Sequence, residues 1–223
     1  MIFEKIHNKG QAKIFKNNQL EFFTKTHPLI IWGMYLPLII LMLNYTVATI
    51  KVNIINAVLI FSGGLLFWTL FEYAIHRFAF HFIPKRKATM KIVYIIHGNH
   101  HEYPRDKQRL FMPPLPSIII ASIIFAAMYF TTSLFNRTGY VFAFFPGFIF
   151  GYLLYGTMHY AIHSWSPPFK WMKSLWRNHH LHHYKDEHRG FGVSTTLWDR
   201  IFGTMYVSEN GKLEKGKLRK MKF

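Results

Sequence analysis

The chain has 223 residues, of which 51% are hydrophobic and 18% aromatic, and its formal net charge is +17. The absence of cysteine excludes disulfide bonds, thiolate metal sites and cysteine nucleophiles. The basic residues avoid the long apolar runs, whereas a nucleic-acid-binding protein interleaves Lys and Arg with aromatic residues on one face. The composition therefore indicates a membrane protein with basic ends and no nucleic-acid partner.

Four apolar segments follow a basic N-terminal segment, residues 1–28, and each has about the 20 residues that a helix needs to cross a bilayer. They are residues 29–50, 52–71, 115–135 and 140–158. Very short connections join the first to the second and the third to the fourth, so each pair is predicted to form a helical hairpin. We expect an all-α integral membrane domain over residues 29–207, followed by a basic tail, residues 208–223.

The positive charges are distributed asymmetrically about these segments. Only Lys51 and Arg137 lie in the two short hairpin loops, so 25 of the 27 basic residues belong to the other side of the membrane. The positive-inside rule makes that side cytoplasmic and places both termini there. The alternative, buried helices of a soluble bundle, gives no reason for this asymmetry.

Ten of the 14 histidines fall into four closely spaced groups. They are His76 and His81; His97, His100 and His101; His159 and His163; and His179, His182 and His183. The first and third groups follow spans that run toward the cytoplasm, and the other two lie in cytoplasmic segments. All ten are therefore expected to converge near the cytoplasmic surface of the membrane, as a helical cap on the four spans.

The spacing within these groups suits metal binding. Residues four apart on a helix, such as His159 and His163, differ by only about 40° around its axis. An H-x-x-H-H group fans over about 100° and can reach one metal or straddle two, whereas His180 lies outside this fan and is expected to support a ligand or face the surface. His76 and His81 would diverge by about 140°, so the helix is expected to end or bend there.

Chemistry favours two metal ions at this cap. Crowded, unbound imidazoles would partly protonate near pH 7 and repel one another, which a cation bound to neutral rings prevents. Ten nitrogens exceed the capacity of one ion, so two ions with about five ligands each is the simple partition. Imidazole suits zinc, copper, iron or nickel, but zinc has no redox chemistry. Glu72 and Glu102 flank the histidines and either orient their rings or are ordinary charges at a helix end.

Two stretches carry a resemblance to a known family: "HGNHHEYPRDKQRLFMPPLP" and "HHLHHYKDEHRGFGVSTTLWDRIFG". Together with the other histidine groups, they resemble the fatty acid hydroxylase superfamily, which includes sterol desaturases, and within it look most like fatty acid 2-hydroxylases. The resemblance covers about residues 60–207. It implies a membrane mono-oxygenase in which all ten histidines bind a pair of iron ions, with zinc often taking their place in recombinant protein.

The same resemblance implies a reaction and its partners. The dimetal centre, supported by Tyr155, would use O₂ and two electrons to hydroxylate carbon 2 of a long-chain fatty acid or lipid acyl chain. Many relatives carry a fused cytochrome b5 domain with a His-Pro-Gly-Gly motif that this sequence lacks. We therefore expect a separate electron donor, such as cytochrome b5 or ferredoxin.

One departure from the family pattern concerns the substrate. The family tends to have Tyr-Asp just before the third histidine group, whereas here Tyr155 is followed by Gly156. We expect this change to bear on substrate handling and on the site of oxidation, and to leave metal binding untouched. Oxidation of a sterol, carotenoid or alkyl lipid by the same machinery is the alternative reading. A non-catalytic zinc protein or metal transporter is disfavoured, because transport histidines would line a path through the bilayer.

Overall fold

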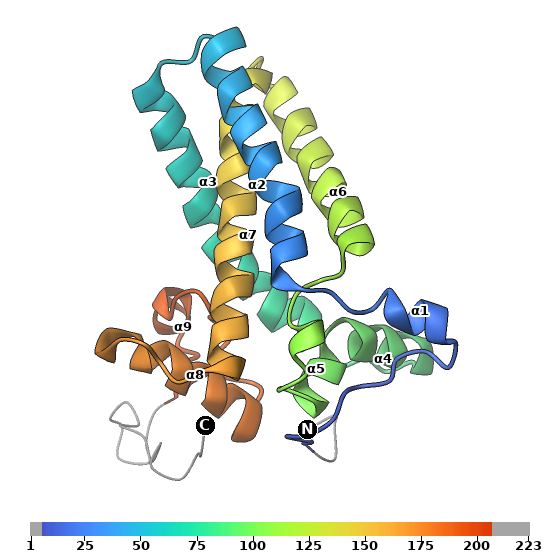
Figure 1. Cartoon of the computed structure of the whole chain (residues 1–223). Helices are drawn as coiled ribbons and strands as arrows, with labels where there is room; N and C mark the ends of the chain where they lie inside the picture. The colour runs from blue at the N-terminus through green and yellow to red at the C-terminus, as the bar shows by residue number, and fades with distance from the viewer. Residues whose placement is uncertain (1–5, 207–223) are drawn as a thin grey trace. The chain divides into compact units, whose positions relative to one another are not determined.

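The computed structural model describes residues 6–206, in which every regular element is a helix (Figure 1). Within this range the chain forms two compact units. The apolar-helix unit comprises residues 22–69 and 111–157, and the histidine unit comprises residues 6–21, 70–110 and 158–206. Each unit therefore combines segments that are far apart in the sequence.

The apolar-helix unit consists mainly of four long helices. They are α2 (Pro28–Asn44, continued by a π-helix at Tyr45–Thr49), α3 (Ile54–Ile75), α6 (Pro114–Ser133) and α7 (Val141–Ser164, preceded by a short 3-10 helix at Thr138–Tyr140). Two of them, α3 and α7, extend beyond the unit at their C-terminal ends. Helices α2 and α6 each have a proline in the first turn, where its missing N–H leaves no helix hydrogen bond unmade.

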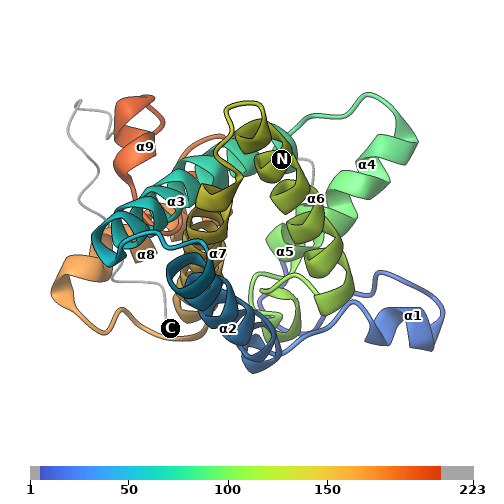
Figure 2. The ribbon, with the colours of Figure 1, turned by 90° about the horizontal axis from the view of Figure 1, so that it is seen from above.

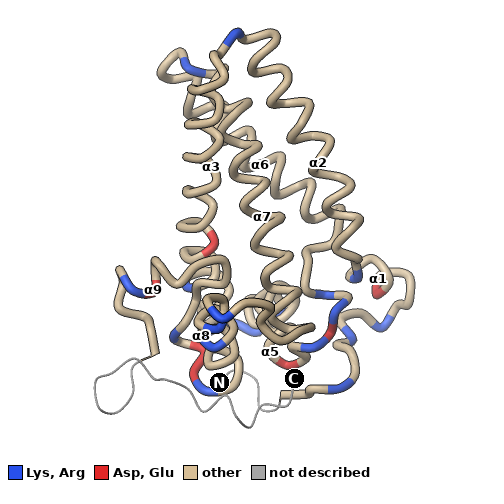
Figure 3. The backbone as a smooth tube through the Cα atoms, turned by 60° about the vertical axis from the view of Figure 1, so that its left-hand side comes forward, with Lys and Arg blue, Asp and Glu red and all other residues tan. Residues whose placement is uncertain are grey.

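These helices have the character of membrane spans. The four candidate spans are Pro28–Thr49, Ile54–Phe80, Lys107–Ser133 and Thr138–Ser164. Helices α2, α6 and α7 contain no Lys, Arg, Asp or Glu, and the tube of Figure 3 is accordingly tan along them. Only 17% of the most apolar window of the second span is buried, so its side chains require an apolar surrounding such as lipid. The prediction of a four-span, all-α membrane protein is confirmed.

Some helix ends differ from the predicted ones. Hydropathy falls after Met158, where the fourth span was predicted to end, but α7 continues to Ser164. The second apolar helix likewise extends beyond residue 71 to Ile75 and then forms a π turn. A helix needs only its backbone hydrogen bonds, so it continues when side chains become polar. As a result, the histidine pair at positions 159 and 163 lies on the span helix itself.

Helices α3 and α7 pack with their backbones in contact, and they lie side by side in both views (Figures 1 and 2). A Cβ atom on Gly64 would lie 2.0 Å from the carbonyl oxygen of Phe144. A Cβ atom on Gly147 would lie 2.0 Å from the carbonyl oxygen of Phe61. Small residues allow this close approach, which drives the association of helices in lipid.

The histidine unit is built from short helices and from the ends of α3 and α7. The short helices are α1 (Asn18–Phe22), a π-helix (His76–Phe80), α4 (Lys87–Val93), a second π-helix (Tyr94–Gly98), α5 (Asn99–Glu102), 3-10 helices (Lys107–Arg109 and Lys170–Met172), α8 (Lys173–Tyr184) and α9 (Leu197–Ile201). Within this unit, Arg109 connects the N-terminal segment to the rest, because it forms ion pairs with both Glu21 and Asp106. The unit thus gathers residues from three separate stretches of sequence.

Candidate metal centre

The ten histidines of the four sequence groups come together in the histidine unit as two groups of five. Group A comprises His76, His81, His97, His101 and His182, and group B comprises His100, His159, His163, His179 and His183. Within each group, one ring nitrogen from each residue lies within 4.8 Å of those from the others. Each group could therefore surround one metal ion, as the expected partition into two sites requires.

The two H-x-x-H-H groups straddle both sites. In α5 and the turn before it, His97 and His101 contribute to group A while His100 contributes to group B. In α8, His182 contributes to group A, whereas His179 and His183 contribute to group B. The fan of about 100° predicted for such a group is consistent with this division, in which one short helical stretch could supply ligands to two neighbouring ions.

A π turn between His76 and His81 explains how these two residues, which would diverge on a regular α-helix, can contribute to the same group. The backbone N–H of His81 donates to the carbonyl of His76 at 3.2 Å, which closes a five-residue turn at the end of the second span. The wider turn brings residues five apart toward the same side, and the helix ends at His81, as expected. Tyr94–Gly98, which contains His97, is also a π-helix. Such turns are rare and are frequent at functional sites.

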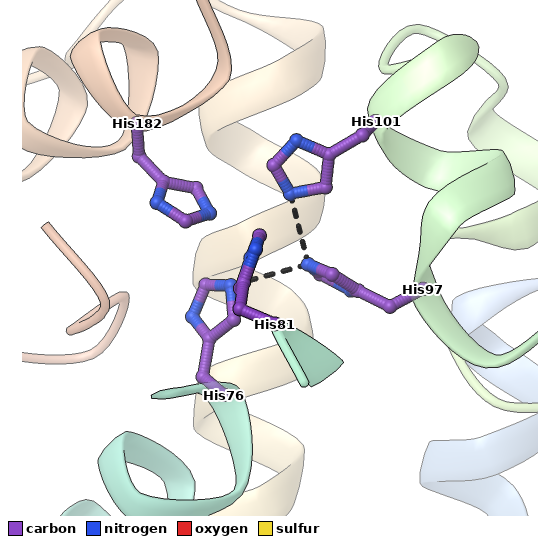
Figure 4. A group of neighbouring side chains, drawn as sticks. All are labelled: His76, His81, His97, His101 and His182. Atoms are coloured by element: carbon purple, nitrogen blue, oxygen red, sulfur yellow. Dashed lines mark hydrogen bonds between the residues drawn. The ribbon is translucent and has the colours of Figure 1, made fainter. Parts of the chain in front are cut away.

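Ring nitrogens face one another in group A (Figure 4). The Nε2 atom of His97 lies 3.2 Å from Nε2 of His76 and 3.0 Å from Nε2 of His101. The Nδ1 atom of His76 lies 2.5 Å from the carbonyl oxygen of Phe191, and that oxygen can only accept, so Nδ1 carries the proton. The Nε2 atom of His76 therefore presents a lone pair toward the centre of the group.

The same arrangement holds for His182, whose Nδ1 donates to the carbonyl of Arg189 at 2.8 Å. Its Nε2 atom, like that of His81, is buried and has no hydrogen-bond partner among residues 6–206. Inward lone pairs on buried nitrogens are costly unless a proton or a cation lies between them. The donor set of group A therefore fits a metal ion that prefers imidazole.

Group B has a similar core. The Nε2 atom of His179 lies 2.8 Å from Nε2 of His163 and 3.1 Å from Nε2 of His183. The Nε2 atoms of His159 and His100 are 2.9 Å apart. Five buried imidazole nitrogens thus converge here as well, and group B fits a second ion of the same kind.

Burial sets the protonation state of these rings. It lowers the pKa of His97, His100, His179, His182 and His183 well below the ordinary value, and neighbouring rings lower it further. For His101, burial lowers the pKa to about 3. The expectation that crowded, unbound rings would partly protonate near pH 7 is therefore wrong, since burial keeps them neutral. The argument for a cation depends instead on lone pairs that face one another.

The predicted supporting residues lie around the two groups. His180 belongs to neither group and lines a cavity of about 40 Å³ with Arg105 and His163. Glu102 accepts a hydrogen bond from the hydroxyl of Tyr94 at 2.8 Å. Glu72 is buried and accepts hydrogen bonds from the loop that follows α8. Whether the two carboxylates affect metal binding stays a prediction at this point.

Tyr155 and Gly156 belong to the apolar-helix unit, on α7. The ring of Tyr155 lies 5.8 Å from the ring of Trp68. A Cβ atom on Gly156 would lie 2.2 Å from Cε1 of the buried Phe111, so the Phe111 ring takes the space that a side chain at position 156 would need. The aspartate typical of the family would not fit beside this ring without a shift.

One buried residue of the histidine unit, Asp199, was not identified from the sequence. Its side chain is fully buried in the structure. It accepts hydrogen bonds from the backbone N–H of Phe191 at 2.9 Å, from that of Gly192 at 2.8 Å, and from the hydroxyl of Thr204 at 2.7 Å. A single acidic residue in the apolar stretch "TLWDRIFG", shortly after the glycine-rich "RGFG", was the available signal.

Comparison with known proteins places this architecture in a family. Residues 61–204 match the family described as "Fatty acid hydroxylase". The ceramide very long chain fatty acid hydroxylase SCS7 of Saccharomyces cerevisiae is 36% identical over 215 residues, which cover 95% of this chain and 53% of that protein. The dihydroceramide fatty acyl 2-hydroxylase FAH2 of Arabidopsis thaliana is 32% identical over 193 residues, which cover 86% of this chain and 79% of the relative.

A solved structure described as full-length scs7p, with only the hydroxylase domain visible, has a similar fold. The TM-score is 0.81 at 33% sequence identity, and the match covers 93% of this chain and 76% of that chain. The present chain spans about half the length of the yeast relative and more of the plant one. With the matched family region, the shared fold and the two histidine groups together, the chain belongs to the fatty acid hydroxylase family.

Proposed function

We propose that this chain hydroxylates carbon 2 of a long-chain fatty acid or of the acyl chain of a sphingolipid-like molecule. The observation that carries the proposal is the convergence of ten imidazoles into two groups of five, in a family member with four apolar spans. Groups A and B would each hold one metal ion through their Nε2 or Nδ1 atoms. The names of the relatives, which specify ceramide, dihydroceramide and fatty acid, support the choice of substrate.

Iron is the metal proposed for the active protein, with two electrons supplied by a redox partner such as cytochrome b5 or ferredoxin. A pair of iron ions would supply the activation of O₂, a redox reaction that zinc cannot perform. Zinc accepts the same imidazole donors, so we expect zinc to compete for these sites in recombinant protein. Metal identity therefore has to be measured together with activity.

The chain's own contribution is to fix the rings and keep water away. Ring nitrogens of the ten histidines gather at two points, and nine of these residues are buried. Burial keeps the cytoplasmic histidines neutral and ready to bind metal. A dry, shaped site limits stray oxidation, which is the usual role of the protein around a reactive cofactor. We assign Tyr155 a supporting role and expect the Phe111–Gly156 contact to make substrate handling more apolar than in relatives with aspartate.

We further propose that the histidine centre and both termini face the cytoplasm. The two short hairpin loops carry one basic residue each, and the remaining 25 basic residues lie outside them. Under the positive-inside rule, this asymmetry supports the orientation.

The test compares lipids from cells with and without the chain by mass spectrometry, together with metal analysis of the purified protein. The wild type is expected to add 2-hydroxy acyl species. His101→Ala removes a ligand from group A and His163→Ala removes one from group B; each should abolish product while the protein still inserts. His188→Ala serves as the matched control, because this exposed histidine belongs to neither group.

Three outcomes would contradict parts of the proposal. Retained turnover in His101→Ala or His163→Ala would refute the assignment of the metal ligands. Iron with a different oxidised lipid, such as a sterol or carotenoid product, would refute the substrate assignment. An unchanged lipid profile with iron bound and a redox partner supplied would refute the enzymatic reading.

A further inference from the structure

The loop that follows α8 reaches the metal centre through its backbone. This positioning loop, residues 189–194 ("RGFGVS"), presents the carbonyl of Arg189 to Nδ1 of His182 at 2.8 Å and the carbonyl of Phe191 to Nδ1 of His76 at 2.5 Å. Both histidines belong to group A. A hydrogen bond to one ring nitrogen fixes the tautomer and the direction of the other, so the loop orients two of the five group A lone pairs.

Two buried carboxylates hold this loop in place. Asp199 accepts from the backbone N–H groups of Phe191 and Gly192, at 2.9 and 2.8 Å. Glu72 accepts from the backbone N–H groups of Val193 and Ser194, at 2.8 and 2.9 Å, and also from the Ser194 hydroxyl. Four consecutive backbone N–H groups are therefore bound by two side chains, one from α3 and one from α9.

Group B has no such support from the positioning loop. The Nδ1 atoms of His179 and His183 are buried and have no hydrogen-bond partner among the residues that the structure describes. Group B also borders the small cavity lined by Arg105 and His163. The two groups thus have the same donor atoms but differ in the interactions that orient them: the positioning loop orients two histidines of group A, whereas in group B a backbone hydrogen bond with Leu110 involves His159.

We infer that Asp199 and Glu72 are positioning residues for group A: by holding the loop, they give the group A ion tighter binding than the group B ion. This inference depends on the proposed function only in requiring that both groups bind metal. Loss of an interaction that orients a ligand histidine typically lowers metal affinity on the order of 10- to 100-fold. That loss should be confined to group A.

The chemistry of the two carboxylates predicts different effects for their amide variants. Both oxygens of Asp199 accept from backbone N–H groups, Oδ1 from Phe191 and Oδ2 from Gly192, so the NH₂ of Asp199→Asn would oppose one of these donors. In Glu72, Oε1 accepts both backbone N–H groups, while Oε2 accepts from the Ser194 hydroxyl, which can also accept a hydrogen bond. Glu72→Gln should therefore be tolerated, whereas Glu72→Ala should not.

The experiment measures zinc affinity by chelator competition and metal stoichiometry by mass spectrometry, on full-length protein in detergent. Single-site backgrounds separate the groups: His163→Ala disables group B and His101→Ala disables group A. In the His163→Ala background, Asp199→Asn and Glu72→Ala should each weaken the remaining ion on the order of 10- to 100-fold, and Glu72→Gln should restore binding. In the His101→Ala background, none of them should change the affinity more than about 2-fold.

Asp106→Asn is the matched control. Asp106 is a buried carboxylate of the same unit that binds Arg109 and the backbone of Ala12, and it does not contact the positioning loop. Its variant should leave both affinities unchanged.

Equal weakening in both backgrounds would show a general loss of structure and overturn the inference, as would unchanged affinity for group A. If Asp199→Asn does not accumulate, the contrast between Glu72→Ala and Glu72→Gln decides the same question. None of these readouts uses lipid hydroxylation. The proposed function therefore fails on the lipid profile alone, while this inference fails on the pattern of zinc affinities.

Discussion

Gly156 illustrates how a single residue can depart from the family pattern in a way that only the fold explains. A Cβ atom at this position would meet the buried ring of Phe111. The family pattern predicted an aspartate at this position, and only the structure shows what has replaced it. The two positions lie 45 residues apart in the sequence, at 111 and 156, so no local pattern could relate them.

We predict that Gly156→Ala destabilises the protein by about 1–3 kcal/mol, the usual cost of forcing extra atoms into a packed interior. Phe111→Val should reduce this cost, because it removes the ring atoms that the new Cβ would meet at 2.2 Å. The measurement is thermal unfolding of the single and double variants in detergent. If Phe111→Val has the same effect with and without Gly156→Ala, the two residues do not share the space assigned to them.

The histidines were the most predictable residues because their spacing is local. Helix periodicity relates positions three and four apart, so the groups at 97–101, 159–163 and 179–183 could be recognised from the sequence alone. The division into groups A and B could not, since it depends on how four segments fold together. Asp199 was missed for the same reason: its backbone partners, Phe191 and Gly192, are brought to it by the path of a loop, and a lone acidic residue indicates little by itself.

At the scale of elements, the spans could be predicted and their ends could not. Length and hydropathy identify an apolar helix, but a helix ends where its backbone hydrogen bonds end. The π turns at His76–Phe80 and Tyr94–Gly98 were beyond prediction because they depend on a shift from i→i+4 to i→i+5 hydrogen bonding. Only the five-residue spacing between His76 and His81 hinted at one of them.

The contact between α3 and α7 gives a prediction about helix packing. Gly64→Leu and Gly147→Leu should each destabilise the protein by about 3 kcal/mol or more, because the new Cβ would meet a backbone carbonyl that cannot rotate away. Gly33→Leu is the control, since a Cβ there meets nothing within 4 Å. Tryptophan fluorescence during thermal unfolding in detergent measures the effect. Similar melting temperatures for all three variants would show that these helices do not depend on close backbone contact.

At the scale of the whole molecule, two patterns in the sequence bear on how the protein is oriented in the membrane: the distribution of basic residues and the order of spans and histidine groups. The charge asymmetry predicts which side of the membrane domain is cytoplasmic, and the order of the spans predicts that all four histidine groups lie on that side. The fold confirms the four apolar helices, while the orientation remains a prediction because helix geometry is the same in either direction. The absence of cysteine makes this prediction straightforward to test.

Single cysteines introduced at exposed positions should report the orientation. In bacterial spheroplasts, a membrane-impermeant maleimide is expected to label Lys51→Cys and Arg137→Cys, which lie in the two hairpin loops, and to leave Lys87→Cys and Lys173→Cys unlabelled until the membrane is permeabilised. The unmodified chain is the control, because it has no thiol to react. The reverse pattern would place the histidine centre outside, away from cytoplasmic electron donors. Labelling of only one loop would contradict the pairing of the spans into two hairpins.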